Sequence, residues 1–193
     1  MRRLTRADLR SLEDYELVRA EFRQRIAAVK APRRVPVGEF IALTFENRDT
    51  VLYQVQEMLR AERIFEPHRI QEELDIYNEL VPADGELSAT LFIEIGEMEE
   101  LRRRLPALVG IEECVWLELG PHRIHAQAEP GRSTETRTAT VHYLRFPVGK
   151  DAAAVLRDLT QPARLRIEHR AYQAVAELSP ETRQALAADL ETP

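Results

Sequence analysis

The sequence contains little cysteine and glycine and no long apolar run. Its single cysteine, Cys114, excludes an internal disulfide and cannot by itself form a thiolate metal cage. Only 7 glycines are present and none are clustered, which argues against a glycine-rich loop that binds nucleotide phosphates. No apolar run approaches the roughly 20 residues of a membrane-spanning helix, and the N-terminal residues lack the apolar core of a signal peptide. We therefore expect a cytoplasmic protein.

Positive charge is also in deficit, because the chain has 33 acidic and 27 basic residues and therefore a formal net charge of -6. A chain with this balance is a poor candidate for sequence-independent binding to nucleic acid or to an anionic membrane surface. Only Lys30 and Lys150 are lysine, and the arginines are spread over the whole chain and mark no single site. The 44% hydrophobic content predicts one domain over residues 1–193 with a core of ordinary size.

Motifs that carry common enzyme chemistry are missing as well. The sequence has no dinucleotide-binding fingerprint, no His-Glu-x-x-His, no Cys-x-x-Cys and no Gly-x-Ser-x-Gly. His122 and His125 look like a metal-binding pair, but three residues apart in a strand they point to opposite faces. The sequence therefore predicts neither a cofactor nor a metal site, and it assigns no catalytic residue.

Hydrophobic periodicity predicts helices mixed with strands. Apolar residues at steps of three and four indicate a helical N-terminal segment over residues 5–31, either as one helix or as a short helix followed by a longer one. Further helices are predicted at 47–63, 67–80, 97–108, 151–159 and 180–190. Extended segments are predicted at 37–45, 87–95, 114–119, 123–128, 138–147 and 165–175, and a mobile loop at 129–137. This order favours the α+β class, with a mixed, largely antiparallel sheet of about five to six strands packed with helices.

Two charged residues interrupt the apolar stripe of the helix predicted at 47–63. Arg48 and Glu62 fall on the same helical face as Val51, Val55 and Leu59. They either lie at the rims of the core or are buried with partners, because an unpaired buried charge costs several kcal/mol. The candidate counter-charges are Glu46, Asp49, Glu57 and Glu94.

His142 lies on the face of its predicted strand that also carries Leu144 and Phe146. One interpretation is a core histidine whose hydrogen bonds are satisfied for structural reasons. The other is a proton carrier or a ligand. The sequence leaves both open.

Four stretches resemble DUF3501, a bacterial family of unknown function. They span residues 4–9, 45–62, 85–95 and 141–146, and the Glu-Asn-Arg-Asp-Thr run at 46–50 is fairly specific. The likeness covers most of the chain up to about residue 175. The resemblance implies no particular reaction. It implies an association with redox proteins, because family members look like companions of rubrerythrin-type di-iron proteins and of iron-sulfur oxidoreductases that resemble heterodisulfide reductase subunits.

The helical periodicity and the family resemblance point to the same set of polar residues. We predict a polar cluster of Arg48, Glu62, Glu94 and His142, with Asp49, Gln54 and Glu57 as secondary candidates. The favoured function is a non-catalytic accessory protein that docks on a rubrerythrin-like or iron-sulfur redox partner. The first alternative is a small enzyme or ligand-binding protein with a polar Arg/Glu/His pocket, in which Arg48 is an anion clamp and His142 or a glutamate is the acid or base. The second is metal binding by Glu57, Glu62, Glu94 and His142. A homodimer is the default oligomeric state.

Overall fold

The computed structural model describes residues 1–131, 133–134 and 138–191. The described helices are α1 (Leu12–Lys30), α2 (Arg48–Ala61), α3 (Pro67–Tyr77), α4 (Met98–Arg104), α5 (Gly149–Val155) and α6 (Pro180–Glu191). The strands are β1 (Arg34–Pro36), β2 (Ile41–Glu46), β3 (Glu86–Ile93), β4 (Val115–Leu119), β5 (His122–His125), β6 (Gln127–Ala128), β7 (Val141–Pro147), β8 (Ala163–His169) and β9 (Tyr172–Glu177). Single 3-10 turns are η1 (Arg6–Asp8), η2 (Ala31–Arg33), η3 (Asn78–Leu80), η4 (Leu105–Leu108) and η5 (Ile111–Cys114).

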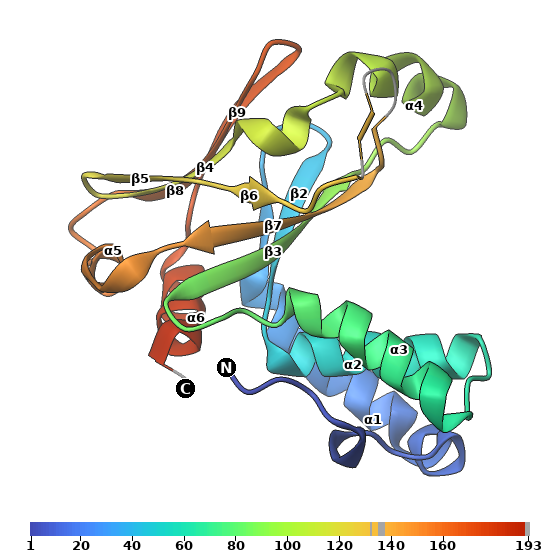
Figure 1. Ribbon diagram of the computed structural model, residues 1–193. Coiled ribbons are helices and arrows are strands. Elements are labelled where there is room, and N and C mark those ends of the chain that lie inside the picture. The colour runs from blue at the N-terminus through green and yellow to red at the C-terminus, as the bar shows by residue number, and fades with distance from the viewer. Residues whose placement is uncertain (132, 135–137, 192–193) are drawn as a thin grey trace.

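The described strands form two sheets in which neighbouring strands run antiparallel. The five-stranded sheet has the order β1-β2-β3-β7-β6, and the four-stranded sheet has the order β5-β4-β8-β9. Gly120 and Pro121 connect β4 to β5 as the predicted hairpin turn. Figure 1 shows both sheets on one side of the molecule and the layer of α1, α2 and α3 on the other.

The main hydrophobic core lies between the two sheets. Because successive side chains of a strand point to opposite faces, every second residue enters this core. Phe45 and Leu91 enter it from the five-stranded sheet, and Leu117 and Leu165 enter it from the four-stranded sheet. All four are fully buried, and their removal from water is the main favourable contribution to folding.

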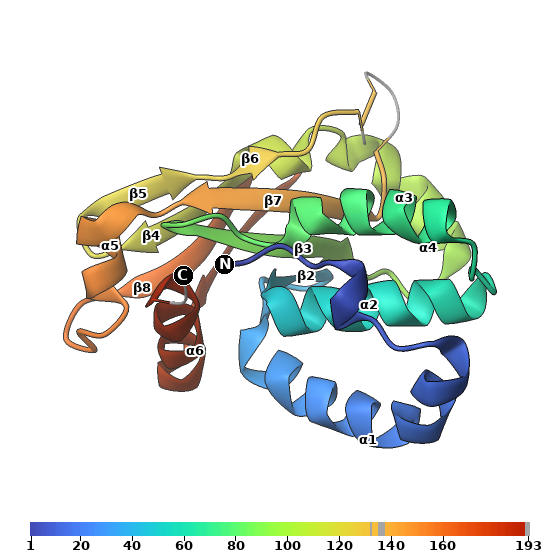
Figure 2. The same cartoon turned by 60° about the horizontal axis from the view of Figure 1, so that its bottom comes forward.

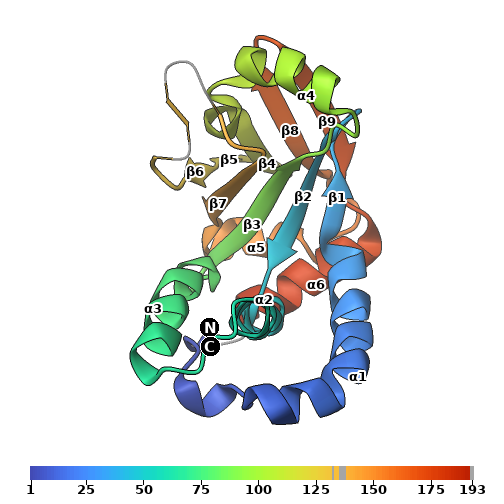
Figure 3. The same ribbon diagram turned by 90° about the vertical axis from the view of Figure 1, so that its right-hand side faces the viewer.

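The helical layer has a smaller core of its own. Val51, Val55 and Leu59 of α2 pack with Leu74 of α3, and α1 packs along α2. Figures 2 and 3 show α2 and α3 beneath the five-stranded sheet, with α1 outermost. Two separate apolar clusters therefore stabilise the sheets and the helical layer.

A buried polar layer separates these two clusters. The helix-facing side of the five-stranded sheet carries Thr44, Glu46, Ser88 and Thr90, all of which are buried. The Glu46 carboxylate accepts hydrogen bonds from the hydroxyls of Thr50, at 2.5 Å, and Thr90, at 2.7 Å. These two bonds offset the cost of burying the carboxylate, because a buried polar group without a partner is destabilising.

The Glu-Asn-Arg-Asp-Thr run forms the junction between β2 and α2. Asn47 caps α2, with its side-chain oxygen accepting from the Thr50 amide at 3.0 Å while the Thr50 hydroxyl accepts from the Asn47 amide at 2.9 Å. This reciprocal pair satisfies two of the amides that a helix start leaves unpaired. The run that carries the family resemblance therefore has a clear structural role.

The α+β class, the antiparallel pairing and the helical N-terminal segment are confirmed. The N-terminal segment is a short turn, η1, followed by the longer helix α1, the second of the two predicted forms. The strands divide between two sheets instead of forming one sheet of five to six. No helix of the described residues is both long enough and apolar enough to span a membrane.

Two predicted segments differ from the structure. Residues 165–175 form a hairpin of β8 and β9 with a turn at 170–171, so the prediction of one extended segment was wrong. Residues 34–36, which lie between the helical segment predicted at 5–31 and the extended segment predicted at 37–45, form strand β1. Part of the loop predicted at 129–137 lies outside the described residues.

Candidate functional site

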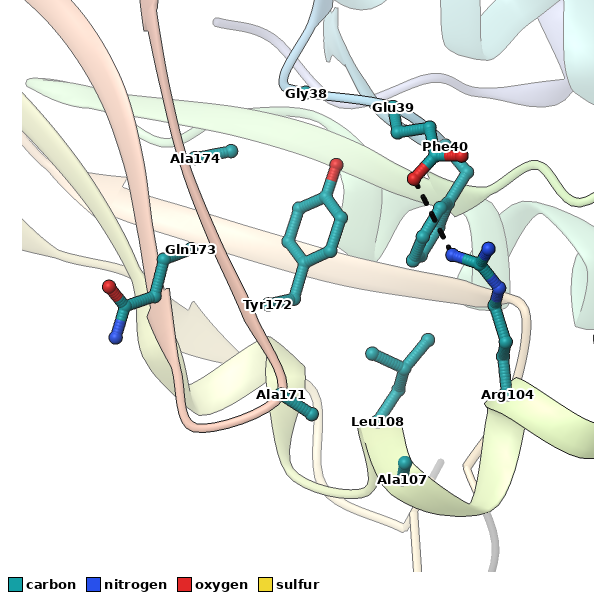
Figure 4. A pocket seen from close by; sticks show the side chains of 10 residues that line it. All are labelled: Gly38, Glu39, Phe40, Arg104, Ala107, Leu108, Ala171, Tyr172, Gln173 and Ala174. Atoms are coloured by element: carbon teal, nitrogen blue, oxygen red, sulfur yellow. Dashed lines mark hydrogen bonds and ion pairs between the residues drawn. The ribbon is translucent and has the colours of Figure 1, made fainter.

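A pocket opens where three separate segments of the chain meet. These segments are the β1–β2 connection, the end of α4 with η4, and the β8–β9 hairpin. The pocket has a volume of about 450 Å³. Its lining residues are Gly38, Glu39, Phe40, Arg104, Ala107, Leu108, Ala171, Tyr172, Gln173 and Ala174. We call it the junction pocket, because it lies where an edge of the four-stranded sheet meets the five-stranded sheet (Figure 4).

Aromatic rings form the apolar wall of the junction pocket. The rings of Phe40 and Tyr172 are tilted by 52° with their centroids 4.7 Å apart. The Arg104 guanidinium carbon lies 5.1 Å from the centre of the Phe40 ring, a cation–π contact. Figure 4 shows Tyr172 and Leu108 pointing into the pocket. This wall offers flat apolar surface to an occupant.

The shape of the pocket depends on Gly38. This glycine has φ +80, and a Cβ atom placed on it would lie 2.3 Å from the Tyr172 hydroxyl oxygen and 2.9 Å from the Ala174 Cβ. The close approach lets the Tyr172 hydroxyl donate a 2.6 Å hydrogen bond to the Val37 carbonyl. That bond joins β9 to the β1–β2 connection and so links the two sheets.

The charged groups of the junction pocket are already paired with one another. Arg104 lies 2.7 Å from a Glu100 oxygen and 3.5 Å from a Glu39 oxygen. The Glu39 side chain remains 74% exposed. Because the guanidinium is neutralised on the protein itself, the pocket suits a mainly apolar occupant whose polar part meets Glu39 at the rim.

The four residues of the predicted polar cluster lie in four separate pairs. These pairs are Arg48 with Asp8 at 2.6 Å, Glu62 with Arg69 at 3.8 Å, Glu94 with Arg34 at 2.6 Å, and His142 with Glu112 at 3.8 Å. Within the described residues, no hydrogen bond or ion pair joins any two of the four. Arg48 and Glu62 mark opposite ends of α2, about 21 Å apart at 1.5 Å per residue.

The secondary candidates all lie on α2 but have different surroundings. Asp49 lies in the first turn, and Gln54 is half-buried. Glu57 accepts hydrogen bonds from the Tyr15 hydroxyl at 2.7 Å and from two Arg19 nitrogens at 2.8 Å, and so anchors α1. Pairing with Arg19 holds the pKa of the Glu57 carboxyl below its ordinary value, and the Tyr15 hydrogen bond adds to this.

The lowered pKa of Glu57 predicts an acid-sensitive attachment of α1. A carboxyl whose pKa falls on folding stabilises the protein above its unfolded-state pKa of 4.5 and loses that contribution as the pH falls through the folded-state value. We expect Glu57→Gln to lower the free energy of unfolding by about 1 kcal/mol at pH 7, since the pair is partly solvated. Urea titrations at several pH values should show the two proteins converging below pH 4.5. A constant difference down to pH 3 would contradict this role.

His142 is buried with a carboxylate that the sequence did not single out. Its Nε2 lies 2.9 Å from the Ala139 carbonyl and 3.0 Å from the Thr138 hydroxyl. Because a carbonyl only accepts, Nε2 donates to Ala139, and Nδ1 faces a Glu112 oxygen at 3.8 Å. Among the described residues, Nδ1 of His142 and Oε2 of Glu112 have no hydrogen-bond partner. His142 shares the buried face of β7 with Leu144 and Phe146, as the strand alternation predicts, and 1% of its surface is exposed.

The other potential ligands are dispersed. In the parts of the chain that the structure describes, no group of three or more His, Cys, Asp or Glu side chains could hold a metal ion. Burial raises the pKa of the Cys114 thiol, and the neighbouring Glu113 and Glu112 raise it further. A raised pKa lowers the fraction of reactive thiolate, so Cys114 has the environment of a structural cysteine.

Only a faint signal of the junction pocket is present in the sequence. Glu39 breaks the apolar face of the strand predicted at 37–45, which marks it as a residue outside the core. Phe40, Arg104 and Tyr172 carry no recognisable motif, and each lies more than 60 residues from the other two in the chain. Only the fold brings these three side chains together.

Comparisons with known proteins place the chain in a family. A family model described as "Protein of unknown function (DUF3501)" matches residues 3–190. The chain is similar to a solved crystal structure of a novel protein of unknown function from Burkholderia pseudomallei K96243. The identity is 38%, the match covers 98% of this chain and 100% of the other, and the TM-score is 0.92. The search of curated proteins gave no match. The predicted resemblance is confirmed, and the chain belongs to the DUF3501 family.

Proposed function

We propose that the protein is a non-catalytic accessory protein that docks on a redox partner through the junction pocket. The observation that carries the proposal is the lining of that pocket. Phe40, Leu108 and Tyr172 supply apolar surface, while Arg104 and the Tyr172 hydroxyl are engaged with the protein's own groups. A lining of this kind favours the burial of an apolar group.

The partner we propose is a rubrerythrin-like or iron-sulfur oxidoreductase, the class that the family resemblance implies. Such a partner would insert an apolar or aromatic side chain into the junction pocket. The exposed carboxylate of Glu39 at the rim and the net charge of -6 favour a basic surface around that side chain.

A pocket-filling substitution tests this proposal. Ala107 is exposed in the wall of the junction pocket, so Ala107→Trp should fill the pocket without disturbing the core. We expect it to weaken partner binding by about 100-fold, the effect of losing an interface hot spot. The matched control is Ala28→Trp, which places the same side chain on an exposed position of α1. The measurement is a tagged pull-down with mass spectrometry, followed by binding titration with the purified iron protein.

Each outcome bears on a different part of the proposal. Recovery of an iron protein by the wild type and by Ala28→Trp, but not by Ala107→Trp, supports both the partner class and the site. Equal recovery by all three proteins would show that docking occurs elsewhere. Recovery of no iron protein by the wild type would contradict the accessory role.

The pocket volume favours a second candidate function, the binding of a small planar molecule. A volume of about 450 Å³ lies in the range of small-molecule sites, and the Phe40 and Tyr172 rings offer stacking surface. Thermal-shift screening with planar aromatic compounds distinguishes this function from the first. A compound that stabilises the wild type and Ala28→Trp but not Ala107→Trp would favour it.

A further inference from the structure

The end of the helical layer far from the sheets combines an exposed phenylalanine with an apolar groove. Phe65, in the connection between α2 and α3, is 69% exposed. It forms part of a groove of about 280 Å³, which we call the tip groove. The apolar lining of the tip groove is Leu9, Leu12, Leu59, Ile64, Phe65 and Ile70. Figure 1 shows the α2–α3 connection at the right-hand end of the helical layer, near the start of α1.

The floor of the tip groove is firmly built. Leu59 and Ile64 belong to the core of the helical layer, and at most 2% of the surface of either residue is exposed. Leu9, Leu12 and Ile70 are partly buried against that core. The groove is therefore a fixed hollow with an apolar base, and Phe65 projects beside it.

The charges around the tip groove are balanced. Four arginines and four carboxylates line it or directly flank its lining residues in sequence, namely Arg10, Arg60, Arg63, Arg69, Asp8, Glu13, Asp14 and Glu66. The whole chain carries a net charge of -6, so two copies repel one another over most of their surface. At the tip, a second copy meets as many opposite charges as like ones.

We propose that a second copy of this chain docks at the tip groove and forms a two-fold symmetric dimer. In such a dimer the same patch serves both partners, so a projecting group must lie beside a cavity that accepts it. Phe65 is the projecting group and the tip groove is the cavity. Each inserted phenylalanine ring would bury about 150–250 Å². Because the local charges balance, the contact between two copies carries no net like-charge repulsion.

Sedimentation velocity over a concentration series tests the proposed dimer. We expect the wild type to sediment as a dimer and Phe65→Ser to raise the dimer Kd at least about 100-fold. The matched control is Leu159→Ser, at a 60% exposed leucine between α5 and β8. Because Phe65 is exposed, Phe65→Ser should retain the circular dichroism spectrum and melting temperature of the folded chain, which separates lost docking from unfolding.

Three results would overturn the proposal. They are a wild type that stays monomeric at the highest concentration reached, a Phe65→Ser variant that dimerises like the wild type, and a Leu159→Ser variant that loses the dimer as fully as Phe65→Ser does. The dimer is independent of partner docking, so Ala107→Trp should dimerise like the wild type.

Discussion

Gly38→Ala is expected to lower the free energy of unfolding by about 3 kcal/mol or more and to abolish binding at the junction pocket. The left-handed φ of +80 costs an L-residue about 1–2 kcal/mol. The added Cβ also overlaps the Tyr172 hydroxyl and the Ala174 side chain, and overpacking of this kind costs about 1–3 kcal/mol. Relief of the overlap would break the hydrogen bond from Tyr172 to Val37 that links the two sheets.

Gly110→Ala is the matched control for this prediction. Gly110 has nearly the same backbone conformation, φ +83, but a Cβ placed there meets no atom of the described residues within 4 Å. It should therefore cost only the conformational strain, about 1–2 kcal/mol. Urea unfolding of both variants measures the difference. Equal losses would show that contact with Tyr172 does not fix the shape of the junction pocket.

His142→Leu is expected to lower the free energy of unfolding by about 3–5 kcal/mol. In the part of the chain that the structure describes, His142 is the one side chain within ion-pair distance of the buried Glu112 carboxylate, and the substitution removes it. Removal of the imidazole is costly because the buried carboxylate then lacks its one polar neighbour at this distance among the described residues, and a buried polar group without a partner is destabilising. In the double variant His142→Leu/Glu112→Leu we expect at least about half of the loss to return, since apolar replacement of a whole buried pair is often neutral or stabilising.

His169 provides the control for the His142 cycle. It is another buried strand histidine, but its Nε2 contacts the Val109 carbonyl at 3.1 Å, and no carboxylate of the described residues pairs with it. The loss caused by His169→Leu should therefore add to the effect of Glu112→Leu without rescue. If Glu112→Leu fails to rescue His142→Leu, or rescues both variants equally, the proposed coupling between Glu112 and His142 is wrong.

Local pattern in the sequence predicted much of the fold. The stripe formed by Val51, Val55 and Leu59 located α2 and its buried face, because a helix repeats every 3.6 residues. The two-residue alternation of residues 141–146 located β7 and placed His142 in the core. Both patterns involve residues only a few positions apart, so they can be recognised without knowledge of the rest of the chain.

These local patterns could not predict contacts between segments that lie far apart in the chain. The division into two sheets depends on pairings such as that of Leu117 with Leu165, which lie 48 positions apart. In the same way, periodicity showed that Arg48 interrupts an apolar stripe, but its partner, Asp8, comes from the N-terminal turn. The candidate site residues were therefore recognised as unusual, while the groups that they contact could not be predicted.

The junction pocket shows the same limit most clearly. Its walls come from residues 38–40, 104–108 and 171–174, and no short motif spans any two of these segments. The turn before Tyr172 falls within residues 165–175, which the sequence pattern predicted as one extended segment. A pocket assembled in this way can be found only once the sheets are placed together.

Hydrogen–deuterium exchange of the protein with the purified iron protein that we propose as its partner tests the central claim most directly. The account predicts slower exchange of backbone amides at residues 37–40, 104–108 and 171–174 when the partner is added, and no such change with Ala107→Trp. The helix α1 should exchange at the same rate with and without the partner. Protection confined to other segments, with these three unchanged, would contradict docking at the junction pocket.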